Sequence, residues 1–294
     1  MKPPVFKYVR VDSVEGALSA LAEHRGDVKI LAGGQSLVPM LNFRIAEPAV
    51  LVDINPVKEL DYIRIEDGWV HIGARTRQRA LEKTPDLNEK CPLLVEAAKW
   101  IGHPQIRNRG TVGGSLVHAD PTAELALLAI LLDAQFVIKG NGKSRTVGPG
   151  DFFESLMVTH IEEDEILTQV RYPVSPPRSG YGFRELCFRH GDFAVVAAAV
   201  QLTAGENGQC TEARVAVSGV GSTPLRIRGA EETLVGNNGR AEVLDAAAAR
   251  VPNEVQPISD LKGSEAYRRE MARVFVRRAL EDAWSMVKGL VENA

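Results

Sequence analysis

Two short segments with paired glycines constrain the fold of this chain more than any other feature. The first covers residues 32–36 (AGGQS) and the second covers residues 111–115 (TVGGS). Each is followed by an apolar run typical of a helix. Glycine lets a backbone approach a ligand closely, and turned N–H groups at a helix start bind anions. Two such loops indicate a ligand with an extended polyphosphate, such as a dinucleotide.

Composition and charge exclude several classes of protein. The 294 residues are 45% hydrophobic and 25% charged, as in soluble globular chains of one large or two to three small domains. A net charge of −3 gives no overall electrostatic reason to bind nucleic acid. The first residues (MKPPVFKYVRVDS) have no apolar core, and no run reaches the roughly 20 apolar residues of a spanning helix. The sequence therefore predicts a cytoplasmic protein without a transmembrane segment.

The cysteines and histidines do not have the spacing of a metal site. Cys91, Cys187 and Cys210 fit neither a disulfide framework nor a zinc or iron–sulfur pattern. The six histidines show no ligand spacing either. We therefore expect this chain to hold no metal and no iron–sulfur cluster of its own.

The first segment has the order of a βαβ unit. Apolar spacing predicts a helix over residues 13–24, with Ser13 as its N-cap. A strand over 28–31 leads into the first glycine pair, and a helix over 36–43 and a strand over 50–54 follow. The first glycine loop is therefore expected between a strand and a helix.

The rest of the chain predicts two further parts. Before the second glycine pair we expect a hairpin around residues 66–68 and a polar loop over 103–110; after it, a buried helix over 121–132 and a strand over 166–172. Arginines cluster at positions 75, 77 and 79 and at 107 and 109. Pro176 and Pro177 mark a linker, beyond which antiparallel strands (183–189, 193–203, 211–218, 223–226) precede helices (229–235, 241–249, 265–287). This order indicates an α+β domain.

Several segments, taken in order, resemble one protein family. Residues 29–37 (KILAGGQSL) and 105–115 (QIRNRGTVGGS) resemble the two FAD-binding loops of the flavoprotein, or medium, subunit of molybdenum hydroxylases. Residues 118–124 (HADPTAE), 189–194 (RHGDFA) and 219–224 (GVGSTP) are similar to later segments of that family. The family includes aerobic carbon monoxide dehydrogenase and xanthine dehydrogenase.

The resemblance implies an α+β fold with three parts. Two FAD-binding subdomains, 1–57 and 58–177, form the FAD-binding fold known as the PCMH type. A C-terminal flavoprotein domain, 178–294, adds an antiparallel sheet and helices. In this family the chain joins a large molybdopterin subunit and a small subunit with two [2Fe–2S] clusters, as a dimer of heterotrimers. Electrons pass from molybdenum through the clusters to FAD and then to an external acceptor.

The resemblance also implies which residues contact FAD. From the first loop they are Leu31, Ala32, Gly33, Gly34, Gln35, Ser36 and Leu37; around the second, Ile101, Gly110, Thr111, Gly114, Ser115, Val117 and His118; elsewhere, Asp120, Glu124, Ile166, Leu167, Arg184 and Phe193. The loops are assigned to the pyrophosphate and Glu124 to ribose hydroxyls. Phe193 stands where the family often has a tyrosine near the isoalloxazine ring.

Simpler structural interpretations remain open for some of these residues. Ser36 could serve only as a helix cap. Glu124 could serve only as a negative charge at a helix N-terminus, and Ile166 and Leu167 could be ordinary core residues. No catalytic acid, base or nucleophile is assigned, because the role implied is electron transfer. Two other functions stay in view: a stand-alone flavin oxidase or reductase of the same fold, and a nucleotide-binding or scaffold module without redox chemistry.

Overall fold

The computed structural model describes residues 2–140 and 142–292 and divides into two compact units. Unit 1 contains Met1–Pro85, His103–Ala119 and Ala134–Tyr172. Unit 2 contains Asp86–Gly102, Asp120–Asp133 and Pro173–Ala294. The chain thus passes between the units more than once, and the division at 57 and 177 stays a prediction. Residues 1 and 293–294, which the outer expected domains include, lie outside the described part.

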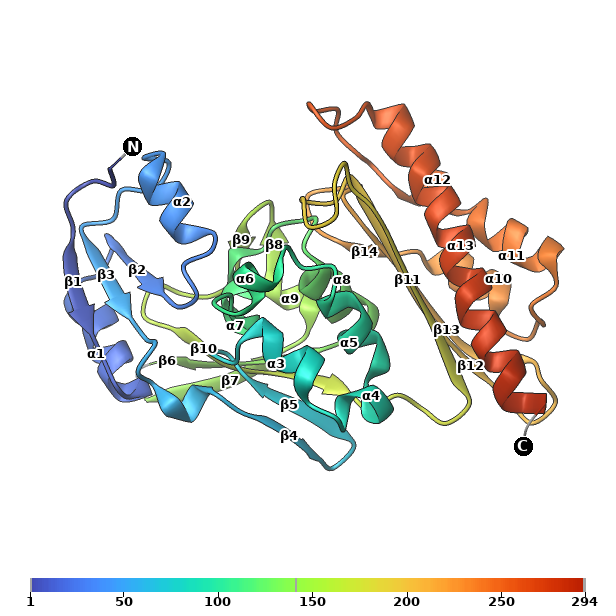
Figure 1. The fold of residues 1–294 in the computed structure, drawn as a ribbon, viewed down its shortest axis with the longest axis horizontal. Helices are drawn as coiled ribbons and strands as arrows, with labels where there is room; N and C mark the ends of the chain where they lie inside the picture. Colours follow the sequence, from blue (N-terminus) through green and yellow to red (C-terminus); the bar gives the residue numbers. More distant parts are fainter. Residues whose placement is uncertain (1, 141, 293–294) are drawn as a thin grey trace. The chain divides into compact units, whose positions relative to one another are not determined.

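Unit 1 begins with a parallel sheet in the order β1-β3-β2 (Figure 1). Its strands are β1 (Lys7–Arg10), β2 (Val28–Leu31) and β3 (Val50–Asp53), and both outer strands run parallel to β3. Helix α1 (Val14–Glu23) buries its apolar side in the same core, and Ser13 accepts a hydrogen bond from the Gly16 N–H at 3.1 Å. Helix α2 (Leu37–Asn42) lies between β2 and β3 in the chain, which confirms the predicted βαβ unit.

A second sheet of unit 1 has the order β4-β5-β10-β6-β7. Its strands are β4 (Ile63–Glu66), β5 (Trp69–Gly73), β6 (Gln135–Gly140), β7 (Lys143–Val147) and β10 (Ile166–Pro173). The smaller elements of unit 1 are η1 (Lys58–Leu60), α3 (Gln78–Lys83), α6 (Pro104–Arg107), α7 (Val112–His118), α9 (Pro149–Phe152), β8 (Phe153–Ser155) and β9 (Val158–Thr159). The polar loop expected over 103–110 contains the short helix α6, so the prediction is wrong for residues 104–107. Proline fits the first turn of that helix because its missing N–H is not needed there.

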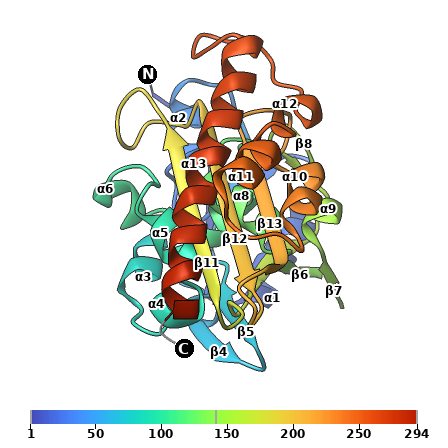
Figure 2. The same cartoon turned by 90° about the vertical axis from the view of Figure 1, so that its right-hand side faces the viewer.

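Unit 2 contains an antiparallel sheet in the order β11-β12-β13-β14. The strands are β11 (Ser179–Leu186), β12 (Val196–Ala204), β13 (Cys210–Ser218) and β14 (Leu225–Arg226). Helix α13 (Glu265–Glu292) crosses one face of the sheet (Figure 2), and α8 (Glu124–Leu131) packs on the other (Figure 1). Because both faces are covered, β12 is a nearly continuous buried apolar run. The remaining helices are α4 (Leu87–Lys90), α5 (Pro92–Ala98), α10 (Arg228–Leu234), α11 (Ala241–Ala248) and α12 (Val251–Glu254).

The observed elements confirm the predicted α+β class, with strands before helices after residue 178. Across residues 2–140 and 142–292, no helix combines the length and apolar character needed to cross a lipid bilayer.

Candidate functional site

The first glycine loop leaves its backbone donors free. It connects β2 to α2, and Gly34 has a φ of 72°, a conformation that residues with a Cβ rarely adopt. Within the described part of the chain, the N–H groups of Gly33, Gly34, Gln35 and Ser36 donate to no protein acceptor. Ser36 occupies the N-cap position, yet its hydroxyl makes no capping bond. A half-buried row of unused donors is typical of an anion site.

The second glycine loop uses most of its donors internally. The N–H groups of Val112 and Gly113 donate, at 2.9 and 2.8 Å, to carbonyl oxygens just after β5. The Thr111 Oγ1 atom accepts the Gly114 N–H at 3.1 Å and so caps α7. Gly114 is nevertheless exposed, and the Ser115 hydroxyl has no hydrogen bond among residues 2–140 and 142–292. This loop therefore offers a ligand a surface and one hydroxyl rather than a row of free N–H groups.

The two loops pack directly against each other within unit 1. A Cβ atom on Gly33 would lie 2.5 Å from the Arg109 carbonyl oxygen and 2.8 Å from the Gly110 Cα. A Cβ atom on Gly114 would lie 3.8 Å from the Ala32 Cβ. The contact at Gly33 is possible only because glycine has no side chain. The glycines therefore let two backbones approach each other and also leave room for a ligand.

Two side chains that sequence reasoning missed connect the loops. Asn55, just after β3, donates from Nδ2 to the Ala32 carbonyl at 2.8 Å. Arg77 donates from Nη2 to the Asn55 Oδ1 at 2.6 Å and from Nη1 to the Arg109 carbonyl. The sequence showed Arg77 only as part of a cluster of arginines, and no pattern singled out Asn55.

Electrostatics around this connection favour an anion. Burial lowers the pKa of the Arg77 guanidinium, and the neighbouring positive charges of Arg75 and Arg109 lower it further. Asp53 lies on the other side of Asn55. Burial alone would raise the pKa of Asp53, but hydrogen bonds from Tyr8 and Asn55 outweigh it and hold the pKa below its usual value. The carboxylate thus stays ionised and fixes Asn55, while the arginines supply positive potential.

The other predicted site residues of unit 1 differ in exposure. Val117 and His118 end α7, and Val117 is exposed. Ile166 and Leu167 are each 3% exposed, and Ile166 belongs to the core under α1 and β3. The side chains of these two residues therefore serve the core, and their contact with a ligand stays a prediction.

Five predicted site residues belong to unit 2. Ile101 is buried, and Glu124 is the first residue of α8. The Asp120 Oδ1 accepts both the N–H and the hydroxyl of Thr122, at 2.8 and 2.7 Å, in the turn before α8. Arg184 is held by two bonds to Asp282, at 2.6 and 2.7 Å.

Phe193 is the most exposed of these five residues. Its side chain lies in the loop between β11 and β12 and is 61% exposed. Lys262 donates to the Phe193 carbonyl at 2.8 Å and lies 5.2 Å from its ring centroid. The exposed ring is thus held by a second loop of unit 2 and remains available to a flat ligand.

A buried acid near Glu124 was also missed. Glu185 on β11 is 7% exposed, and within the described residues neither of its oxygens has a well-aligned hydrogen bond. Burial, reinforced by the charge of Glu124, raises the pKa of Glu185 to about 9. The thiol of Cys187 lies beside it. Burial therefore favours the protonated form of this carboxyl.

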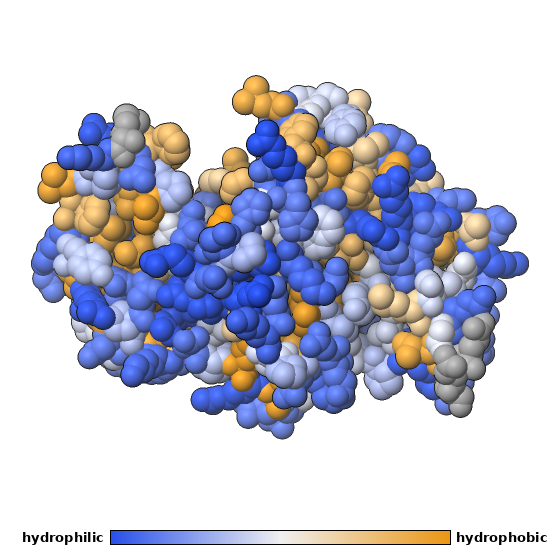
Figure 3. All heavy atoms as spheres, viewed as in Figure 1, coloured by the Kyte–Doolittle hydropathy of each residue, from blue (hydrophilic) through white to orange (hydrophobic). Residues whose placement is uncertain are grey.

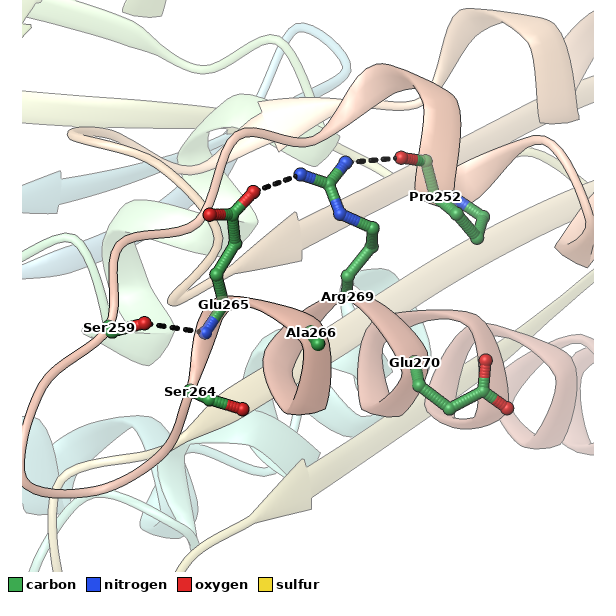
Figure 4. A pocket seen from close by; sticks show the side chains of 7 residues that line it. All are labelled: Pro252, Ser259, Ser264, Glu265, Ala266, Arg269 and Glu270. Carbon is green, nitrogen blue, oxygen red and sulfur yellow. Dashed lines mark hydrogen bonds and ion pairs between the residues drawn. The ribbon is translucent and has the colours of Figure 1, made fainter.

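Figure 4 shows a surface pocket at the start of α13. There Arg269 donates to the Pro252 carbonyl and to Glu265, each at 2.6 Å, and the Glu265 N–H donates to Ser259. Because these groups satisfy one another, the pocket lacks the spare donors of the first glycine loop. No group of three or more His, Cys, Asp or Glu side chains suited to a metal occurs among residues 2–140 and 142–292.

Family models match nearly the whole chain. Residues 4–175 match the FAD binding domain in molybdopterin dehydrogenase. Residues 181–283 match the CO dehydrogenase flavoprotein C-terminal domain.

Curated relatives and solved structures agree with these matches. The chain is 44% identical over 283 residues to the 6-hydroxypseudooxynicotine dehydrogenase complex subunit alpha of Paenarthrobacter nicotinovorans, covering 96% of each. It is 38% identical to the carbon monoxide dehydrogenase medium chain of Hydrogenophaga pseudoflava, covering 97% of this chain and 99% of the relative. Carbon monoxide dehydrogenase from the latter organism, lacking the Mo-pyranopterin moiety, superposes with a TM-score of 0.94 at 39% identity, covering 97% and 99%. Quinoline 2-oxidoreductase from Pseudomonas putida 86 superposes with a TM-score of 0.93 at 33% identity, and the match covers 99% of this chain and 100% of that chain.

Proposed function

Because this chain belongs to the family of FAD-binding medium subunits of molybdenum hydroxylases, the flavoprotein components of these oxidoreductases, we propose that its glycine loops hold the pyrophosphate of one FAD. The observation that carries this assignment is the row of four N–H groups at residues 33–36. They have no acceptor among residues 2–140 and 142–292 and lie beside the exposed backbone of Gly114.

The chemistry of these residues fits the cofactor. A pyrophosphate carries negative charge and only accepts hydrogen bonds, so N–H and O–H donors suit it. The first loop supplies the N–H donors and the unused Ser36 hydroxyl, and Ser115 supplies a hydroxyl from the second. The arginine cluster adds positive potential. The donor set therefore matches the phosphate part of FAD.

The remaining contacts are proposed by chemical type. Glu124 accepts from ribose hydroxyls, and Leu31, Leu37, Ile101 and Val117 supply apolar surface. Phe193 presents an exposed ring to the isoalloxazine. The other proposed contacts are Gln35, Gly110, Thr111, His118, Asp120, Ile166, Leu167 and Arg184. Bound FAD supplies the redox chemistry, since flavins exchange electrons singly or in pairs. The residues of this chain bind and orient it, and none is assigned as a catalytic acid, base or nucleophile.

The proposal places the chain in a larger cytoplasmic complex. A small subunit with [2Fe–2S] clusters delivers electrons, a large molybdopterin subunit carries the substrate chemistry, and an external acceptor receives the electrons. A dimer of such heterotrimers is the proposed assembly. Support comes from relatives named as the medium chain or as one subunit of a complex, which this chain matches over 96–97% of its length.

An absorption spectrum tests this proposal. The chain is purified alone and after co-expression with the products of its neighbouring genes. Flavin bands in both preparations, with iron–sulfur absorbance only after co-expression, are expected. Flavin bands with enzyme turnover by the chain alone would instead indicate a stand-alone flavin enzyme. A colourless protein in both preparations would contradict FAD binding and leave a structural or scaffold role.

A further inference from the structure

We propose that Asn55 and Arg77 form a bridge that sets the spacing of the two glycine loops and so pre-organises the pyrophosphate site. The inference rests on the proposed FAD site. Asn55 binds the Ala32 carbonyl of the first loop, and Arg77 binds the Arg109 carbonyl that leads into the second. The 2.6 Å bond between Arg77 Nη2 and Asn55 Oδ1 joins the two halves.

The bridge is anchored on the Asn55 side. The Asp53 Oδ1 accepts both the Asn55 N–H, at 2.9 Å, and its Nδ2, at 2.6 Å. The Asn55 carbonyl in turn accepts from Arg75 Nε at 2.6 Å. Tyr8 donates to the second oxygen of Asp53. Asn55 therefore has little rotational freedom, and through it the Ala32 carbonyl is held at a fixed place relative to the β1-β3-β2 sheet.

The chemistry of Arg77 suits a bridge rather than a simple charge. A guanidinium presents several N–H donors in one rigid plane, whereas an ammonium is a compact point charge on a flexible stem. Two different Arg77 nitrogens bind two acceptors on separate segments. Fixing the loops before binding reduces the entropy lost when the ligand arrives. Arg77 and Asn55 are thus positioning residues that act through the loops.

FAD titration of the full-length, flavin-free chain tests the bridge. The variants are Arg77→Met, Arg77→Lys, Asn55→Ala and the double variant Asn55→Ala/Arg77→Met. Arg145→Met is the matched control, because Arg145 also joins a side chain, Glu165, to a backbone carbonyl, that of His160. Neither of its partners belongs to a glycine loop. Circular dichroism confirms that each variant is folded.

The two single deletions are each expected to raise the Kd for FAD by about 10-fold to 100-fold, and the double variant no further, since either change breaks the same bridge. Arg77→Lys should raise Kd about 5-fold or more, and Arg145→Met less than about 2-fold. If Arg77→Met does not fold, Asn55→Ala and Arg77→Lys carry the test.

Some outcomes would overturn the bridge while leaving FAD binding intact. One is a set of Kd values for the Arg77 and Asn55 variants that equal that of the control. Another is full retention of affinity in Arg77→Lys, which would mean that Arg77 contributes only its positive charge. Additive effects in the double variant would also overturn it, because they would mean that the two side chains act separately. Failure of the wild-type chain to bind FAD would instead reject the proposed function itself.

Discussion

The two glycine loops look alike in sequence and differ in how their hydrogen-bonding groups are used. In the first, the N–H groups of residues 33–36 have no acceptor within the described residues. In the second, those of residues 112–115 are bonded to neighbouring carbonyls or to the Thr111 hydroxyl. Buried backbone donors are nearly always satisfied in native proteins. Counting donors therefore separates a loop that can receive a ligand from one that mainly supports it.

The same contrast holds for the hydroxyl residue beside each glycine pair. Ser36 precedes α2 but makes no capping bond, whereas Thr111 precedes α7 and caps it. Substitutions of Gly34 and Ser36 in the first loop should therefore affect FAD affinity more than stability, and substitutions in the second loop should do the reverse.

The largest effect is expected from Gly113→Val in the second loop. A Cβ atom there would lie 2.6–2.8 Å from atoms of Ala74, mostly backbone that cannot move aside. Overpacking of this kind costs about 3 kcal/mol of unfolding free energy or more. Thermal unfolding of the flavin-free chain should show the melting temperature lowered by at least about 6 °C. A melting temperature equal to that of the wild type would mean that this loop does not support the fold.

Gly34→Val in the first loop should mainly remove FAD binding. The positive φ of Gly34 is unfavourable for a β-branched residue, so the loop must change shape. We expect the Kd for FAD to rise at least about 100-fold, while the unfolding free energy of the flavin-free chain falls by only about 1–2 kcal/mol. Titration and urea unfolding measure the two quantities. Stoichiometric FAD in the purified variant would break the comparison.

Smaller effects are expected when the hydroxyl beside each glycine pair is removed, by Ser36→Ala in the first loop and by Thr111→Val in the second. Ser36→Ala should leave stability within about 0.5 kcal/mol and raise the Kd for FAD about 5-fold to 10-fold, the effect of one hydrogen bond. Thr111→Val should lower stability by about 1 kcal/mol through loss of the cap. Equal losses of unfolding free energy in the two variants, with equal Kd values for FAD, would mean that the two hydroxyls have the same role.

Two buried carboxyls, those of Asp53 and Glu185, should affect the pH dependence of stability in opposite directions. Asp53 is hydrogen-bonded and its pKa is lowered, so its stabilisation is lost as pH falls. Glu185 is desolvated, with a pKa raised to about 9, so its favourable protonated state is complete in acid and is lost as pH rises toward that value. Glu185→Gln should therefore gain stability relative to the wild type between pH 6 and 8, by up to about 1.4 kcal/mol per pH unit. A constant difference across this range in urea unfolding would show that the pKa of Glu185 is not raised in the folded chain.

Much of the fold follows from sequence patterns that report local structure. The short strand before the first glycine pair, the Ser13 cap and the apolar run of β12 could all be predicted because they depend on nearby residues. The segments 86–102 and 120–133 could not be assigned to unit 2, since their packing depends on strands that follow much later in the chain. Residues 104–107 were expected in a loop, but Pro104 is compatible with a helix start.

The candidate site was predictable only in part, for the same reason. The glycine pairs and Ser36 can be found by pattern, because their backbone conformation is local. The bridge could not, since Asn55 and Arg77 meet only when β3 and the segment after β5 are folded together. Glu185 was missed because one acidic residue in an alternating strand looks solvent-exposed, whereas α8 places Glu124 near it.

Three apolar side chains in and after helix α2 of unit 1 are exposed. Val38, Phe43 and Ile45 are 42%, 66% and 72% exposed, and Figure 3 shows orange spheres among blue ones in this part of unit 1. Apolar surface of this kind often marks an interface.

Hydrogen–deuterium exchange of the full-length chain, with and without FAD, tests the central claim most directly. The account predicts that FAD slows exchange strongly at the amides of residues 33–36, which have no acceptor in the described part of the chain. The amides of residues 112–115 should exchange slowly in both states. Unchanged exchange at residues 33–36 in a chain that binds FAD, with new protection only in the second loop, would contradict the division of roles between the loops.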